Sequence, residues 1–129
     1  MNEQEKIDFL LAQRHKPEVD RTDWMNVNKN LIDLAVAYSG YCIFHNIEVC
    51  FTSIIRPMIP GVSKTNIHAA GRAFDASARG WNTDLMDNFL KDGNNRFKDV
   101  AAISLADNQP RAFLFHGDIL HLHAQVRDL

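Results

Sequence analysis

The sequence predicts an α+β domain in which N-terminal helices pack on a small, largely antiparallel sheet. Helical periodicity fills the first third of the chain, short β-branched and aromatic segments follow, and one more helical segment lies among them. The 129 residues fit a single domain, which we place at residues 1–129. An apolar fraction of 46%, with eight Phe and two Trp, is sufficient to fill one core.

Two helices are predicted at the start of the chain. Residues 3–15 carry apolar side chains at helical spacing and end before Pro17. A longer helix is expected to begin at the capping side chains of residues 20–23. Its apolar positions follow the 3.6-residue period. They are Trp24, Val27, Leu31, Leu34, Ala35, Tyr38 and Cys42.

Short strands and a third helix are predicted in the remainder. The first strand is rich in β-branched and aromatic residues and stops at Pro57, and residues 57–70 look irregular. Thr83 is expected to cap the third helix, which should end at residues 92–95. The predicted strands cover residues 47–55, 71–77, 100–105, 112–115 and 121–126.

The composition argues against several partners. Fourteen basic and sixteen acidic residues give a net charge of −2, which predicts neither nucleic acid nor an anionic membrane as a partner. No apolar run approaches the length of about 20 residues that spans a bilayer. The first residues lack the pattern of a secretory signal, so we expect a cytoplasmic chain, which we take as a monomer. Cys42 and Cys50, in apolar surroundings, are expected to be buried thiols.

The segment His68-Ala69-Ala70-Gly71-Arg72-Ala73-Phe74-Asp75 carries the strongest chemical pattern. An imidazole and a carboxylate seven residues apart can reach one ion if a tight turn separates them, and Gly71 permits such a turn. Both groups are good zinc ligands. The small Ala73, on the strand face of Asp75, leaves room for a bound group.

A third ligand is expected from the C-terminal segment. His121 and His123 are two residues apart on a predicted strand, so their side chains face the same side, and Asp118 lies just before them. Two histidines and one aspartate with an open fourth position are typical of a catalytic zinc site rather than a closed structural one.

The string H-A-A-G-R-A-F-D resembles the H-x-x-G-x-A-x-D signature of the zinc D-Ala-D-Ala carboxypeptidase and L-Ala-D-Glu endopeptidase family. Vancomycin-resistance D,D-dipeptidases, phage endolysins and the hedgehog signalling domain share the fold of that family. Residues 52–57 are similar to its S-x-x-R segment, and residues 117–126 resemble its final strand. The resemblance covers residues 48–126 and implies a hedgehog/D,D-peptidase-like fold.

The resemblance implies a role for each matching residue. His68 and Asp75 would be zinc ligands, Arg56 would bind the substrate carboxylate or the oxyanion, and Asp118 would be the general base. Two registers remain open for the third ligand. The acid-x-x-His register pairs Asp118 with His121, whereas the H-x-H register, which the string H-L-H-A-Q-V resembles more closely, selects His123. His121 would then be the next candidate for the base.

The function implied by the resemblance is that of a zinc metallopeptidase acting on peptidoglycan stem peptides. It would be an L-Ala-D-Glu endopeptidase or a D-Ala-D-Ala carboxypeptidase, best matched by a phage-type endolysin that stays in the cytoplasm until lysis. The alternative is a non-catalytic, zinc-containing binding domain of the same fold, as in hedgehog. The presence of both Asp118 and Arg56 favours the enzyme.

Overall fold

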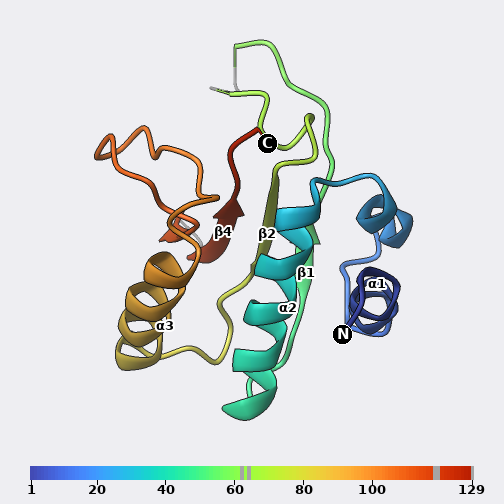
Figure 1. Cartoon of the computed structure of the whole chain (residues 1–129), viewed down its shortest axis with the longest axis vertical. Coiled ribbons are helices and arrows are strands. Elements are labelled where there is room, and N and C mark those ends of the chain that lie inside the picture. The colour runs from blue at the N-terminus through green and yellow to red at the C-terminus, as the bar shows by residue number, and fades with distance from the viewer. Residues whose placement is uncertain (62, 64, 118–119, 129) are drawn as a thin grey trace.

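The computed structural model describes residues 1–61, 63, 65–117 and 120–128, which form an α+β architecture (Figure 1). Within these residues there are three α-helices, one 3-10 helix and one four-stranded sheet. The helical elements are α1 (Glu3–Leu11), η1 (Arg21–Met25), α2 (Lys29–Phe44) and α3 (Thr83–Arg96). The strands are β1 (Phe51–Ser53), β2 (Ala73–Ser77), β3 (Phe113–His116) and β4 (His121–Gln125). All pairings are antiparallel, in the order β1-β2-β4-β3, which confirms the predicted fold class.

The main core lies between α2 and one face of the sheet. Figure 1 shows α2 running along the sheet, with α1 on one side of it and α3 on the other. Aromatic rings fill this layer, and Phe51 meets Trp24 and Tyr38 with ring centroids 4.9 and 5.4 Å apart. Phe74 on β2 and Leu122 on β4 are also fully buried in this core. Because side chains alternate along a strand, the residues beside them face away from α2.

The long helix predicted from residues 20–23 is wrong, because the chain forms two separate helices there. Asp20 caps η1 by accepting a hydrogen bond from the backbone N–H of Thr22, and Asn28 caps α2 in the same way. The backbone N–H of Asn28 also donates to the carbonyl of Gly71, at 2.9 Å. The non-helical residues 26–28 therefore contact the turn before β2 through their backbone.

Several predicted boundaries also differ from the structure. The helix predicted over residues 3–15 ends at Leu11, and the strand predicted over 47–55 is reduced to β1. Residues 100–105 form only isolated bridges rather than a strand. The third helix is capped by Asn82 rather than Thr83 and continues through Gly93 to Arg96. Gly93 packs against the ring of Phe113, and a Cβ atom at this position would lie only 2.8 Å from that ring.

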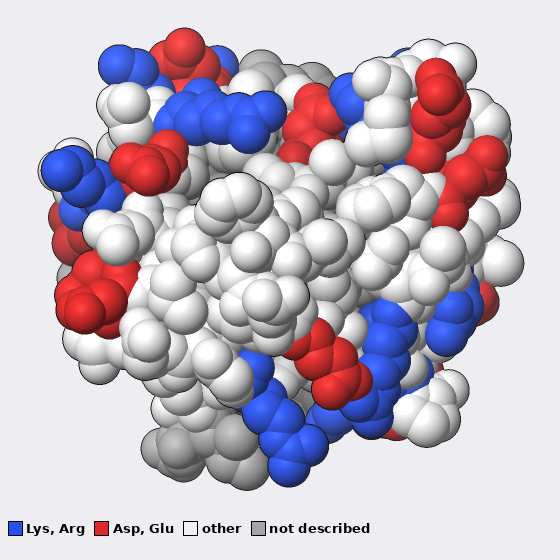
Figure 2. All heavy atoms as spheres, turned by 90° about the horizontal axis from the view of Figure 1, so that it is seen from below, with Lys and Arg blue, Asp and Glu red and all other residues white. Residues whose placement is uncertain are grey.

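The surface carries charges of both signs. Figure 2 shows one end of the molecule, where acidic and basic residues surround a largely uncharged area and no single sign dominates. This distribution agrees with the small net charge of −2. In the part of the chain that the structure describes, no helix has the length and apolar character needed to cross a bilayer.

Candidate metal centre

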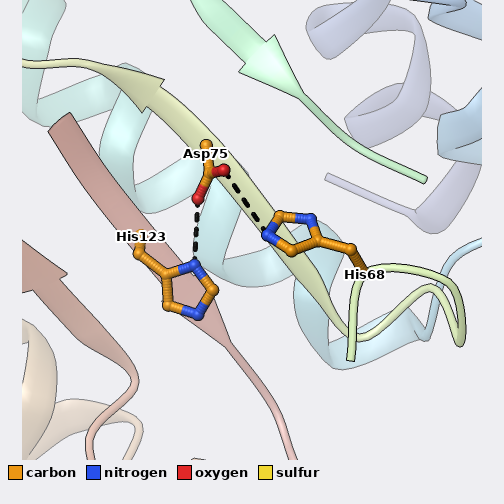
Figure 3. Close-up of side chains that lie close together, drawn as sticks. All are labelled: His68, Asp75 and His123. Carbon is orange, nitrogen blue, oxygen red and sulfur yellow. Dashed lines mark hydrogen bonds and ion pairs between the residues drawn. The ribbon is translucent and has the colours of Figure 1, made fainter. Parts of the chain in front are cut away.

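Two neighbouring strands bring Asp75 and His123 together on the sheet face that lies away from α2. The two residues are directly opposite each other in the antiparallel register of β2 and β4. The Nδ1 atom of His123 lies 2.9 Å from Oδ1 of Asp75 (Figure 3). Both residues are buried, although 48 positions separate them along the chain. Strand pairing therefore creates this contact, and the close packing of the sheet keeps it in place.

The turn before β2 brings His68 to the same carboxylate. Hydrogen bonds from Gly71 N to His68 O and from Arg72 N to Ile67 O close this turn, at 3.1 and 2.9 Å. Gly71 has a φ of +69°, and a Cβ atom on it would lie 3.1 Å from a backbone oxygen of Asn26. Glycine is required here because the turn is left-handed and packs closely against the chain between η1 and α2. As a result, His68 Nε2 lies 3.4 Å from Oδ2 of Asp75 (Figure 3).

The environment of His68 determines which of its ring nitrogens is free to bind an ion. Its Nδ1 lies 3.0 Å from the carbonyl oxygen of Ile54, and because a carbonyl only accepts, Nδ1 carries the proton in the neutral ring. The electron pair is then on Nε2, which is buried and has no hydrogen-bond partner among the described residues. A buried nitrogen electron pair facing a carboxylate is costly unless a cation lies between them. This arrangement fits a metal ion.

The electrostatics of the site keep Asp75 ionised. Burial alone would raise the pKa of its carboxyl, but in the absence of a metal ion hydrogen bonds and positive charge from protonated His123 and His68 outweigh burial and hold that pKa well below its ordinary value. Arg56 adds a positive charge, with Nη1 3.6 Å from Oδ2, and His121 Nε2 lies 3.8 Å from Oδ1. The carboxylate is thus in the form that binds metals.

Together, His68, Asp75 and His123 form a buried group that could hold a metal ion. One potential ligand atom from each residue lies within 4.8 Å of the others. Two imidazole nitrogens and one carboxylate are a donor set that zinc favours, and three protein ligands leave a fourth position for water or substrate. The predicted meeting of residues 68 and 75 with a C-terminal histidine is present, since the rings of His68 and His123 have centroids 5.4 Å apart.

The geometry favours His123 over His121 as the third member of this group. His123 is buried and makes the shorter contact to Asp75, whereas 31% of the His121 side chain is exposed. His121 lies beside the group and pairs with His116 across β3 and β4, with ring centroids 4.5 Å apart. Asp75, His116 and His121 form a second, more exposed group of potential ligands. The predicted general base, Asp118, lies outside the described residues.

Two residues that the sequence pattern did not assign also belong to this region. The ring centroids of His116 and His123 lie 5.2 Å apart. Burial, together with the neighbouring His123 and His121, lowers the pKa of His116. Gln125 contacts the other nitrogen of His123, at 3.0 Å from Nε2. The sequence signal for Gln125 was its position two residues after His123, because alternate residues of a strand share a face.

Two hollows open next to the metal-binding group. The larger, of about 860 Å³, reaches His68, His116 and His123. Three arginines, Arg56, Arg72 and Arg127, line it, with no Asp or Glu among its described lining residues. The smaller, of about 430 Å³, reaches Asp75 and His121, and Arg56 lines both. The group is therefore accessible from a basic, partly apolar cleft.

Comparison with known proteins adds no identification. The chain matches no protein-family model, no curated protein and no solved structure. The geometry of the site is therefore the basis for assigning a function.

Proposed function

We propose that this chain is a zinc metallopeptidase that hydrolyses peptidoglycan stem peptides, with a hedgehog/D,D-peptidase-like fold. The observation that carries the proposal is the buried group of His68, Asp75 and His123 beside a basic cleft. The buried Nε2 of His68, which faces the Asp75 carboxylate at 3.4 Å and makes no hydrogen bond among the described residues, supports a cation at this group. The resemblance in the segment from His68 to Asp75 supports the choice of zinc and of the peptidase family.

The order of the site residues along the fold also supports the proposal. The H-x-x-G-x-A-x-D segment forms a turn that leads into β2, and the C-terminal histidine comes from the adjacent strand β4. The parts of the resemblance that lie in the described residues thus contribute to one location. A chance match of a short pattern would not require its two ends and a distant histidine to meet.

In this proposal, His68 Nε2, Asp75 and His123 hold the ion. A bound zinc ion polarises a substrate carbonyl and lowers the pKa of a water molecule to about 7. Asp118 accepts the proton of the attacking water and delivers it to the leaving amine, and His121 is the next candidate for that role. Peptide hydrolysis adds this water across the C–N bond, so one product gains a carboxylate and the other an amine.

Arg56 is proposed to orient the substrate. Its side chain is 55% exposed, lines both hollows and lies 3.6 Å from Asp75, so it can reach a substrate at the metal-binding group. A guanidinium can bind a carboxylate through two parallel hydrogen bonds. Stem peptides carry carboxylates, and the basic lining of the larger hollow suits them. Both an L-Ala-D-Glu endopeptidase and a D-Ala-D-Ala carboxypeptidase satisfy this requirement, and a phage-type endolysin is the role we propose.

The decisive experiment is mass spectrometry of defined muropeptides incubated with the purified chain, with zinc or with a chelator. We expect zinc-dependent cleavage of one peptide bond, and the product masses identify that bond. His68→Ala should lose the metal together with turnover, whereas Asp118→Ala should retain the metal and lose turnover. Asp107→Asn, at an exposed carboxylate that pairs with Arg111, is the matched control and should remain active.

Intact muropeptides would contradict the enzymatic proposal. If the chain binds zinc and leaves every muropeptide uncleaved, the non-catalytic binding domain becomes the better assignment. If Asp118→Ala retains full activity, the general base is another residue, and His121→Ala is the next variant to measure.

A further inference from the structure

Gln125 occupies an unusual position for a buried amide. It lies on β4 two residues after His123, on the same strand face, and only 7% of it is exposed. A buried amide must satisfy two donors and one acceptor oxygen, because an unpaired polar group is costly in the interior. Its hydrogen bonds therefore show what its side chain does.

Two backbone carbonyls determine the orientation of this amide. Gln125 Nε2 donates to the carbonyl oxygen of Arg111 at 3.0 Å and lies 3.5 Å from that of Ala102. Rotating the amide by half a turn would place its oxygen against these two acceptors, which is repulsive. Oε1 of Gln125 is consequently directed at His123 Nε2, at 3.0 Å.

This contact determines where His123 carries its proton. Both oxygens beside the His123 ring only accept, the amide oxygen of Gln125 at Nε2 and the carboxylate oxygen of Asp75 at Nδ1. A neutral ring that keeps its hydrogen bond to Gln125 is protonated at Nε2 and has its electron pair on Nδ1. That nitrogen faces Oδ1 of Asp75 at 2.9 Å. An electron pair and a carboxylate oxygen repel each other at this distance, so the contact is favourable only with a proton or a metal ion at Nδ1, and the same holds at His68 Nε2 on the other side of Asp75. A metal ion bound by all three side chains meets both requirements at once.

We propose that Gln125 is a positioning residue that selects Nδ1 of His123 as the metal-binding nitrogen. This inference rests on the metal centre of the proposed function. The two histidines then bind through different nitrogens, His68 through Nε2 and His123 through Nδ1, because an oxygen acceptor holds the proton of the other nitrogen in each ring. Outer partners of this kind orient the ring, and losing one weakens metal affinity by about 10- to 100-fold.

The first test identifies the ligand nitrogen in the wild-type chain by NMR. The ¹⁵N-labelled protein is loaded with ¹¹³Cd²⁺, a spectroscopic substitute for zinc, and spin coupling between cadmium and each imidazole nitrogen is measured. We expect coupling to Nδ1 of His123 and to Nε2 of His68, with the His123 proton on Nε2. Coupling of cadmium to Nε2 of His123 would overturn the inference.

The second test removes the amide. Gln125→Met keeps a similar length and shape without the hydrogen bonds, and zinc affinity is measured by competition with a chromophoric chelator. Asn94→Leu is the matched control, since Asn94 makes two hydrogen bonds to the backbone of Phe113 and none to the metal-binding group. We expect Gln125→Met to bind zinc about 10- to 100-fold more weakly, with Asn94→Leu close to wild type.

The outcomes separate this inference from the proposed function. Wild-type affinity in a folded Gln125→Met variant, or an equal loss in both variants, would overturn the role of Gln125 while leaving the metal centre intact. If the wild-type chain binds neither cadmium nor zinc, the metal centre and the role of Gln125 both fail. The NMR measurement needs no variant, so the inference can be refuted even if Gln125→Met does not fold.

Discussion

Zinc should stabilise the wild-type chain strongly and Asp75→Asn only slightly. An ion that binds only the folded state at 100 times its Kd adds about 2.7 kcal/mol to the free energy of unfolding. For 129 residues, an unfolding entropy of about 2.1 cal/mol/K per residue gives about 0.27 kcal/mol/K in total. The expected increase in Tm is therefore about 10 °C.

The Asp75→Asn variant has nearly the same shape but loses the anionic ligand of the buried group. Since removing an outer partner of a ligand costs up to about 100-fold in affinity, losing the ligand itself should cost at least that much. At the same zinc concentration the stabilisation then falls to about 0.4 kcal/mol, and the Tm shift to about 1.5 °C.

Thermal unfolding followed by circular dichroism, with and without zinc, measures both shifts. Asp107→Asn is the control, because its carboxylate is exposed, pairs with the Arg111 side chain and is not among the residues of the buried group. That variant should keep the full shift. An equal zinc shift in wild type and Asp75→Asn would refute the assignment of Asp75 as a ligand.

Three further predictions follow from other parts of the structure. Gly71→Ala should destabilise the chain by about 1–3 kcal/mol because of its positive φ and close contacts, whereas Gly40→Ala, within α2 and with nothing near its Cβ position, should stabilise it by about 0.5–1 kcal/mol. Urea unfolding measures both changes, and a Gly71→Ala variant as stable as wild type would contradict the account of the turn. Burial lowers the pKa of His15, which accepts a hydrogen bond from Trp24, so the free energy of unfolding should fall as the pH drops below about 6.5, where the unfolded chain takes up the proton first. His15→Gln should lose less of this free energy between about pH 7 and 5, and an equal loss in wild type and variant would exclude His15 as a cause. Arg56→Ala should lower kcat/KM on a carboxylate-bearing stem peptide by about 100-fold or more, and an equal loss on the amidated peptide would argue against carboxylate recognition.

The sequence was most informative about the metal-binding group. His68, Gly71 and Asp75 lie close together along the chain, so the turn that joins them could be predicted from local rules. The alternation along the last strand also placed His121 and His123 on one face, as the structure shows. Local rules could not decide between these two histidines, because the choice depends on the register between β2 and β4.

The features that local rules could not predict depend on contacts between distant segments. The apolar residues on both sides of the break between η1 and α2 follow one helical period, so the period alone predicts a continuous helix. The break allows the backbone N–H of Asn28 to bond to the carbonyl of Gly71, a residue distant in sequence. Gly93 is unfavourable in a helix by propensity, yet it lies inside α3, where a larger residue would collide with the ring of Phe113. The amide of Gln125 is oriented by the carbonyls of Ala102 and Arg111, which lie in other segments of the chain and are not predictable from the local sequence around Gln125.

Anomalous diffraction from zinc-loaded crystals provides the final test of the metal centre. We expect one strong peak about 2.0–2.2 Å from His68 Nε2, from a carboxylate oxygen of Asp75 and from His123 Nδ1. A zinc ion bound elsewhere, with these three side chains in contact only with one another, would contradict the proposed centre.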